Sequence, residues 1–223
     1  MAAVDDALMR DVAAIGRISA VPTILRVVAE LTGLRFAAVA RVTRERWVAC
    51  AVYDELSFGL RSGSELDVNT TLCAQVRDTC TAIVIEHASL DPDYREHITP
   101  KMYGFESYLS VPITLSDGSY FGTVCALDPR PTAIDRKAVL TQVTLFAEMI
   151  ALAYESDRRT QETLLAKARL ESFVMGAPAA IAVFNGPDLV FELANARYRG
   201  YIGDRPLVGL PAKVAMPELE SSG

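Results

Sequence analysis

The sequence is poor in the residues that metal centres and disulfide frameworks need. Only 4 cysteines and 2 histidines occur among 223 residues, and no cysteine pair has the Cys-x-x-Cys spacing of a zinc or redox motif. We therefore expect no metal site, and reduced cysteines that pack as small apolar side chains. Cys73, Val76 and Cys80 share one face of a predicted helix, which places both of these cysteines toward a core.

Basic charge and long apolar runs are also scarce. The formal net charge is −6, and no stripe of lysine and arginine marks a nucleic-acid surface. No run approaches the roughly 20 apolar residues of a membrane span, and the N-terminus lacks a signal-peptide pattern. We expect a cytoplasmic protein with no nucleic-acid partner and no membrane insertion.

Sequence signatures of catalysis are missing too. There is no Ser-His-Asp order, no pair of carboxylates at a strand end and no phosphate-binding P-loop. Asp91 and Asp93 flank Pro92 and are more typical of a helix cap than of a metal site. We predict no catalytic residue, and this chain is not expected to be an enzyme.

What the sequence does contain is a central antiparallel hairpin within a chain that is 51% hydrophobic. Ser107–Leu115 and Tyr120–Leu127 each alternate apolar and polar residues, and Ser116–Gly118 between them is typical of a tight turn. The alternation groups Leu109, Val111, Ile113 and Leu115 on one face of the first strand, and Phe121, Thr123, Cys125 and Leu127 on one face of the second.

The segments before the hairpin alternate between helical and strand patterns. Pro22 and Gly33 mark the ends of one helix, and Asn69 is expected to cap another. The loop at Asp54–Asn69 is long enough to suggest a binding role. We predict helices at Asp5–Ile18, Val21–Leu31, Thr70–Thr79 and Asp93–His97, and strands at Leu34–Val42, Trp47–Tyr53 and Ala82–Glu86.

The hairpin also carries a family resemblance. The phrases S-Y-L-S-V-P-I, D-G and F-G-T-V-C-A-L-D resemble the end of a GAF domain, a small-molecule sensor module of bacterial signalling proteins. The similarity extends over about Asp5–Tyr154, and we assign residues 1–154 to this domain. The resemblance implies an α+β fold with a five- or six-stranded antiparallel sheet flanked by helices. It also implies that the first helix often packs against a second subunit.

A very long helix is predicted after the hairpin, over residues 134–173. Its seam residues recur at spacings of 4 and 3, as in a parallel two-stranded coiled coil, and the centre of the seam is polar. We interpret it as a signalling helix of a homodimer; the alternative is an ordinary surface helix. The apolar seam residues are Leu145, Met149, Leu152, Ala166, Leu170 and Phe173.

The character of the chain changes again at residue 174. Two short strands, Ile181–Phe184 and Leu189–Leu193, lead into A-N-A-R-Y and later L-V-G-L-P, which resembles the opening of a PAS domain. Such a domain needs about twice the length present, so we expect residues 174–223 to be a truncated N-terminal part of one.

A ligand pocket is expected between the sheet and the segments on one of its faces. Aromatic side chains with polar tips gather in Asp91–Tyr108 and suit a planar ligand. The alternative is an aromatic cluster that only covers the sheet. The pocket candidates are Cys73, Asp93, Tyr94, His97, Met102, Tyr103 and Tyr108.

Three specific GAF activities can be compared with these residues. Covalent bilin photoreceptors resemble this region but present a Cys-His pair, whereas only His97 is present here, so a bilin could bind only without a thioether. Free-methionine-sulfoxide reductases have a cysteine near the position of Cys73, yet the attacking cysteine has no counterpart in residues 91–108. The Asn-Lys…Phe…Asp-Glu set of cyclic-nucleotide-binding GAF domains is incomplete.

The sequence as a whole predicts a regulatory sensor module of a bacterial signal-transduction protein such as a histidine kinase. It would sense a small molecule of unknown identity, or relay a signal through a dimeric helix. A non-covalent bilin photoreceptor and a sulfoxide-reductase-like enzyme are the alternatives.

Overall fold

The computed structural model describes residues 2–203 and 205–218, with side chains from residue 6 onward. Two compact units are present, one ending at Arg159 and the other beginning at Thr160. The last residues assigned to the second domain, 219–223, lie outside the described part of the chain. A long helix, α5 (Arg136–Gly176), contributes to both units.

The first unit is built on a six-stranded antiparallel sheet with the order β3-β2-β1-β6-β5-β4. β1 and β6 lie at its centre, and the hairpin partner β5 lies next to β6. The strands are β1 (Phe36–Val42), β2 (Trp47–Asp54), β3 (Glu65–Leu66), β4 (Ile83–Ile85), β5 (Ser107–Thr114) and β6 (Tyr120–Asp128).

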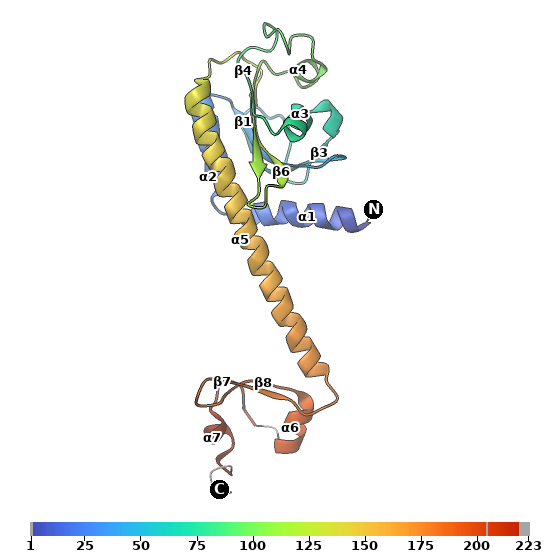
Figure 1. Cartoon of the computed structure of the whole chain (residues 1–223), viewed down its shortest axis with the longest axis vertical. Coiled ribbons are helices and arrows are strands. Elements are labelled where there is room, and N and C mark those ends of the chain that lie inside the picture. Colours follow the sequence, from blue (N-terminus) through green and yellow to red (C-terminus); the bar gives the residue numbers. More distant parts are fainter. Residues whose placement is uncertain (1, 204, 219–223) are drawn as a thin grey trace. The chain divides into compact units, whose positions relative to one another are not determined.

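Helices cover the two faces of this sheet unequally (Figure 1). The larger core lies under α1 (Ala2–Arg17), α2 (Val21–Thr32) and the first half of α5. The opposite face is covered by a short 3-10 helix, η1 (Val68–Thr70), by α3 (Leu72–Thr79), by α4 (Ile98–Tyr103) and by the loop after β2. The predicted α+β architecture is confirmed, with helices on both faces of an antiparallel sheet.

The predicted hairpin is present, and β5 divides its side chains between the two cores as expected. Leu109 and Val111 belong to the core under α5, and Tyr108 belongs to the opposite one. The prediction for Phe121 was wrong, because a bulge at Ile113/Thr114 shifts the register at the turn end of the hairpin. Phe121 therefore packs under α5, away from Cys125.

Two helix boundaries also differ from expectation. The helix predicted at Asp93–His97 is a series of turns, and the real helix, α4, begins after His97, whose Nδ1 accepts a hydrogen bond from the backbone N–H of Thr99 at 3.2 Å. Asn69 does not cap α3; it lies within η1, where the Asp67 carboxylate accepts its backbone N–H. The Asp67 carboxylate and the His97 imidazole thus cap the N-termini of η1 and α4, and the sequence pattern predicted neither cap.

Cys80 is the one cysteine of the four that is exposed. The prediction that it is buried on the same helix face as Cys73 was wrong, because α3 ends at Thr79 and Cys80 takes a left-handed conformation with φ of 50°. Cys50, Cys73 and Cys125 are reduced and buried, as expected.

The long helix is a single unbroken element, and it buries one stripe in the first unit. Its length and composition would allow it to cross a membrane, and the bent pair α1–α2 meets the same criterion. In the first unit, however, α5 packs on the sheet as a core helix does. The buried residues are Val139, Val143, Ala147, Ile150, Ala151 and Tyr154.

The second unit contains a small hairpin beside two short helices. Its elements are β7 (Ala182–Asn185), β8 (Val190–Ala194), α6 (Ala196–Ile202) and α7 (Ala212–Ala215). Asn195 is fully buried, and its side chain accepts from the backbone N–H groups of Ile181 and Tyr198 while donating to the Val174 and Ala179 carbonyls. The asparagine of the A-N-A-R-Y phrase therefore fixes where the strand ends and α6 begins.

Candidate functional site

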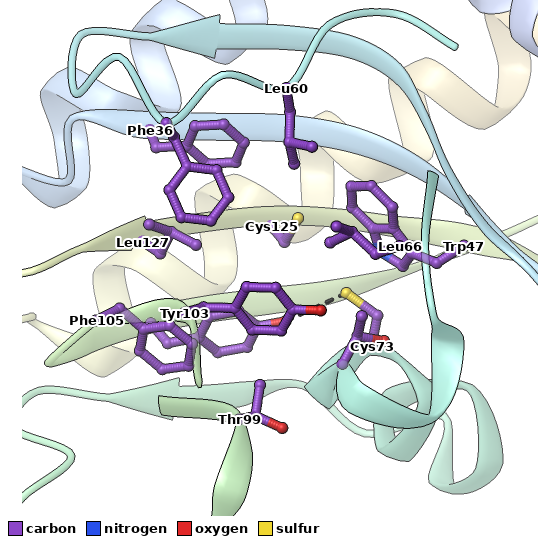
Figure 2. Close-up of a pocket in the computed structure, with 13 residues that line it drawn as sticks. Phe36, Trp47, Leu60, Leu66, Cys73, Thr99, Tyr103, Phe105, Cys125 and Leu127 are labelled. Carbon is purple, nitrogen blue, oxygen red and sulfur yellow. Dashed lines mark hydrogen bonds between the residues drawn. The ribbon is translucent and has the colours of Figure 1, made fainter. Parts of the chain in front are cut away.

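A small apolar cavity lies between the sheet and the segments opposite α5. Its volume is about 40 Å³, and β1, β2, β5 and β6 provide its floor while α3, α4 and the loop after β2 provide its walls (Figure 2). The lining residues are Phe36, Trp47, Phe58, Leu60, Leu66, Thr71, Cys73, Thr99, Tyr103, Phe105, Tyr108, Cys125 and Leu127.

Hydrogen bonds between η1 and α4 hold the walls of the cavity together. The hydroxyls of Thr70 and Tyr103 lie 2.6 Å apart, and the Thr99 hydroxyl donates to the Thr70 carbonyl at 2.8 Å. On the other side, the Asp54 carboxylate accepts from the backbone of Leu56 and Gly59, which folds the loop back over the sheet. The cavity is thus bounded by tied segments rather than by open loops.

Polar groups gather at the Cys73 end of this cavity. Its sulfur lies 3.2 Å from the Tyr108 hydroxyl and accepts a hydrogen bond from the Thr123 hydroxyl at 3.3 Å, with the Ser110 hydroxyl at 3.9 Å. Ser110 is the cross-strand partner of Cys125, so the sulfur of Cys73 lies over this pair of strands. The inward face of α3 therefore places the Cys73 thiol against hydroxyl groups from β5 and β6.

The groups of this cluster differ in the direction in which their pKa values are shifted. The hydrogen bond from Cys125, followed by those from Thr123 and Tyr108, lowers the pKa of Cys73 to about 6, and burial opposes this. The pKa of Cys125 is raised well above its ordinary value by the same hydrogen bond and by burial. Burial likewise raises the pKa of Tyr108. Cys73 is thus the group of the cluster that ionises first.

One further buried donor lies at this site. Among the described residues, the indole N–H of Trp47 and the hydroxyl of Tyr120 are buried polar groups with no hydrogen bond. Trp47 is only 3% exposed and lies at the Cys73 end of the cavity (Figure 2). The indole N–H of Trp47 also contributes to lowering the pKa of Cys73, so it adds to the donors around that sulfur.

Three of the pocket candidates come together, and four lie elsewhere. Cys73, Tyr103 and Tyr108 line the cavity. Tyr94 packs at the edge of the same core, His97 caps α4, and Asp93 and Met102 are exposed. Sequence reasoning missed Trp47 and Cys125, although strand alternation alone would have placed both on the inner face of their strands.

Within residues 2–203 and 205–218, no group of three or more histidine, cysteine, aspartate or glutamate side chains is arranged to hold a metal ion.

Some solved structures and a curated protein are similar to parts of this chain. The GAF domain of PixJ from Thermosynechococcus elongatus, in its blue-light-absorbing form, is similar with a TM-score of 0.51 and 14% identity over 71% of this chain and 93% of that one. A GAF domain/HD domain protein from Geobacter sulfurreducens has a TM-score of 0.50 and 13% identity, covering 62% and 91%. At these identities the likeness concerns the fold alone.

The curated relative is diguanylate cyclase DgcP of Escherichia coli (strain K12). It is 30% identical over 104 residues, which are 44% of this chain and 30% of the relative, so the match spans less than a third of that protein. The family model of the GAF domain matches residues 17–154, more than half of the sequence, and this segment contains the whole sheet together with α2, α3, α4 and the first part of α5. The chain belongs to the GAF domain family.

Proposed function

We propose that this chain is the regulatory sensor part of a bacterial signalling protein such as a sensor histidine kinase. In this proposal the state of the cavity is passed to α5. The observation that carries it is a set of part-buried and exposed polar contacts that joins the two ends of the first half of α5 to β5, to the hairpin turn and to α1.

The first joint lies where the chain enters α5. The Ser107 hydroxyl, at the start of β5, donates to the Glu86 and Arg130 carbonyls at 2.7 and 3.0 Å and accepts from the backbone N–H of Thr132 at 2.8 Å. The Glu86 carboxylate accepts from the backbone N–H of Ile134 at 3.0 Å. Because Ser107 directly precedes the cavity residue Tyr108, a shift of β5 moves the start of α5 as well.

The second joint lies where α5 passes the hairpin turn. The Glu155 carboxylate accepts from the Ser116 hydroxyl at 2.6 Å, and Tyr154 donates to Asp11 of α1 at 2.6 Å. Asp157 pairs with Arg17 at the end of α1. These contacts hold α5 against the hairpin turn and α1. A movement of the hairpin would therefore change the position of α5.

The size of the cavity limits what it can hold as it stands. Its volume of about 40 Å³ is far below the roughly 300 Å³ of ordinary ligand pockets. A tetrapyrrole would have to displace α4 and the loop after β2, which disfavours the bilin alternative, although PixJ is a receptor of similar fold. The sulfoxide-reductase alternative still lacks its attacking cysteine. A ligand of a few heavy atoms fits best.

Our proposal also includes a cytoplasmic homodimer and a following PAS domain. The six apolar seam residues of α5 are exposed in the single chain, and exposed apolar stripes of this spacing are typical of coiled coils. The buried Asn195 at the start of α6 supports the PAS assignment of the second unit.

The proposal can be tested by ligand binding combined with hydrogen exchange. Small molecules that raise the melting temperature of the wild-type chain should lose this effect in Leu60→Phe, which fills the cavity. The matched control, Leu56→Phe, lies in the same loop but does not line the cavity and should respond like wild type.

Transmission is tested separately from binding. A ligand that needs the cavity should change amide exchange in the first turns of α5, over residues 136–143. Ser107→Ala removes the first joint and should keep the ligand-dependent shift in melting temperature while losing the change in α5. Binding in the cavity with no change in α5 exchange in the wild-type chain would refute the relay.

A further inference from the structure

Two of the buried cysteines meet at one end of the cavity. Cys73 projects from α3 and Cys125 from β6, and both line the cavity. The Cys73 sulfur lies 3.9 Å from the hydroxyl of Ser110, which is the cross-strand partner of Cys125. Their surroundings combine a small cavity with hydrogen-bond donors around one sulfur. No other cysteine in the described chain has such a setting.

We propose that Cys73 and Cys125 are a redox-active thiol pair, in which Cys73 reacts with a small hydroperoxide in the cavity and Cys125 then closes a disulfide. This names a regulatory chemistry for the cavity, and only its signalling consequence rests on the proposed function.

The surroundings of Cys73 suit an attacking thiolate. The Thr123 hydroxyl donates to its sulfur at 3.3 Å, and the Tyr108 hydroxyl lies at 3.2 Å. Hydrogen bonds from such groups stabilise negative charge on sulfur, and the thiolate is the form that attacks peroxides. The lowered pKa of Cys73 agrees with this geometry.

The cavity also suits the oxidant. A volume of about 40 Å³ admits water-sized molecules and excludes large ones. The indole of Trp47, on a side chain 3% exposed, lies at the same end of the cavity (Figure 2) and adds a hydrogen-bond donor beside the Cys73 sulfur. A small hydroperoxide has a scissile O–O bond, so it matches a water-sized cavity with a nucleophile at one end.

The other two cysteines provide internal contrasts. Cys50 is buried in the core on the opposite face of the sheet, where burial raises its pKa to about 12. Cys80 is exposed at the end of α3, outside the cavity. One chain therefore contains a buried thiol with a raised pKa, an exposed thiol outside the cavity and the proposed pair.

The proposed reaction reduces the hydroperoxide in one step and forms the disulfide in a second. The Cys73 thiolate attacks one oxygen of the hydroperoxide, the O–O bond breaks, and the leaving hydroxide or alkoxide takes a proton to give water or an alcohol. The Cys125 sulfur then attacks the sulfenic sulfur of Cys73, the S–O bond breaks, and the Cys125 proton leaves with the hydroxide as a second water. Both sulfurs are oxidised by one electron, and the peroxide is reduced by two.

The test uses the full chain and hydrogen peroxide as the probe. After brief exposure, intact mass should show the loss of two hydrogen atoms, and peptide mapping should show Cys73 linked to Cys125. Within the same molecules, Cys73 should be consumed at least about tenfold faster than Cys50, because reactivity follows thiolate character and access. Cys125→Ser should instead accumulate one oxygen atom on Cys73, trapped by dimedone.

Two controls and two contrary results complete the test. Cys50→Ser and Cys80→Ser should form the Cys73–Cys125 disulfide as the wild type does. Oxidation of Cys50 as fast as Cys73, or of Cys80 alone, would overturn the proposal, and both are read in the wild-type chain without any variant. A disulfide that leaves exchange in α5 unchanged would preserve the thiol pair and count against the relay. If another ligand changes exchange in α5 but peroxide forms no disulfide, the relay is supported and the thiol pair is refuted.

Discussion

Asp128, at the end of β6, is a buried charged residue whose carboxylate accepts several hydrogen bonds. Its side chain is fully buried, and its oxygens accept from the Arg35 guanidinium at 2.7 and 2.9 Å and from the backbone N–H of Arg130 at 2.8 Å. Burial alone would raise the pKa of this carboxyl, yet the hydrogen bonds from Arg35 and Arg130 hold it well below its usual range. The aspartate thereby ties the end of β6 to the start of β1.

Replacing Asp128 with Asn should destabilise the chain by about 2 kcal/mol. This is less than the roughly 3–5 kcal/mol of a fully buried pair, because Arg35 is still 34% exposed and can be solvated. Urea unfolding measures the difference. Asp78→Asn breaks an exposed pair with Arg77 and should leave the midpoint nearly unchanged. Equal midpoints for Asp128→Asn and wild type would contradict the assignment.

The same residue predicts a pH dependence of stability. The pKa of Asp128 is lowered in the folded chain, so its contribution is complete above the ordinary aspartate pKa of about 3.9 and is lost as the pH falls below it. Between about pH 5 and pH 2, wild type should lose more unfolding free energy than Asp128→Asn. Parallel curves in urea unfolding over this range would show that the carboxyl is not the cause.

Single residues were the hardest to place from the sequence. Cys73, Tyr103 and Tyr108 were chosen for their chemistry, and they do line the cavity. Cys125 was treated only as part of a strand pattern, because nothing local shows that a helix 50 residues earlier brings a second thiol to it. His97 was read as a ligand candidate, yet the structure gives it the role of a cap. Such roles depend on long-range contacts that periodicity does not encode.

At the scale of elements, alternation was a reliable guide wherever the ladder is regular. The boundaries of β5 and β6 agree with prediction to within one residue. The exception is Phe121, which a one-residue bulge moved to the other face. The polar segment around α4 failed for a different reason, since Asx-type turns and a histidine cap decide the start of that helix rather than hydrophobic spacing.

Gly122 in β6 provides a sharp test of strand packing. A Cβ added there would lie 1.9 Å from the carbonyl oxygen of Ala40 in β1, and the backbone cannot move aside cheaply. Gly122→Ala should therefore cost about 1–3 kcal/mol or more in unfolding free energy.

The matched control is Gly16, which lies exposed near the end of α1 with no atom within 4 Å of an added Cβ. Gly16→Ala should stabilise the chain by about 0.5–1 kcal/mol, because alanine loses less backbone entropy in a helix. Thermal unfolding distinguishes the two variants. Loss of stability in both, or in neither, would contradict the predicted close approach of β6 to β1.

At the scale of the whole molecule, α5 connects the GAF fold to a second unit. The predicted seam of α5 carries exposed apolar residues that a second copy of the chain would cover in a dimer. Leu170 lies on the seam and is 64% exposed, whereas Leu165 is 59% exposed but falls on the outer side of the same heptad pattern. The two leucines are therefore matched in chemistry and exposure and differ only in the face they occupy.

If the chain dimerises through this seam, Leu170→Glu should weaken the dimer while Leu165→Glu should not. Burial of one leucine contributes about 1.5–3 kcal/mol per side chain, so the dissociation constant should rise by at least tenfold in the first variant. Repulsion between the two introduced carboxylates adds to this effect in a parallel arrangement, where seam positions face each other. Light scattering over a dilution series measures both variants against wild type. A wild-type monomer would remove the dimeric relay, and equal weakening by the two variants would place the contact on a different face of α5.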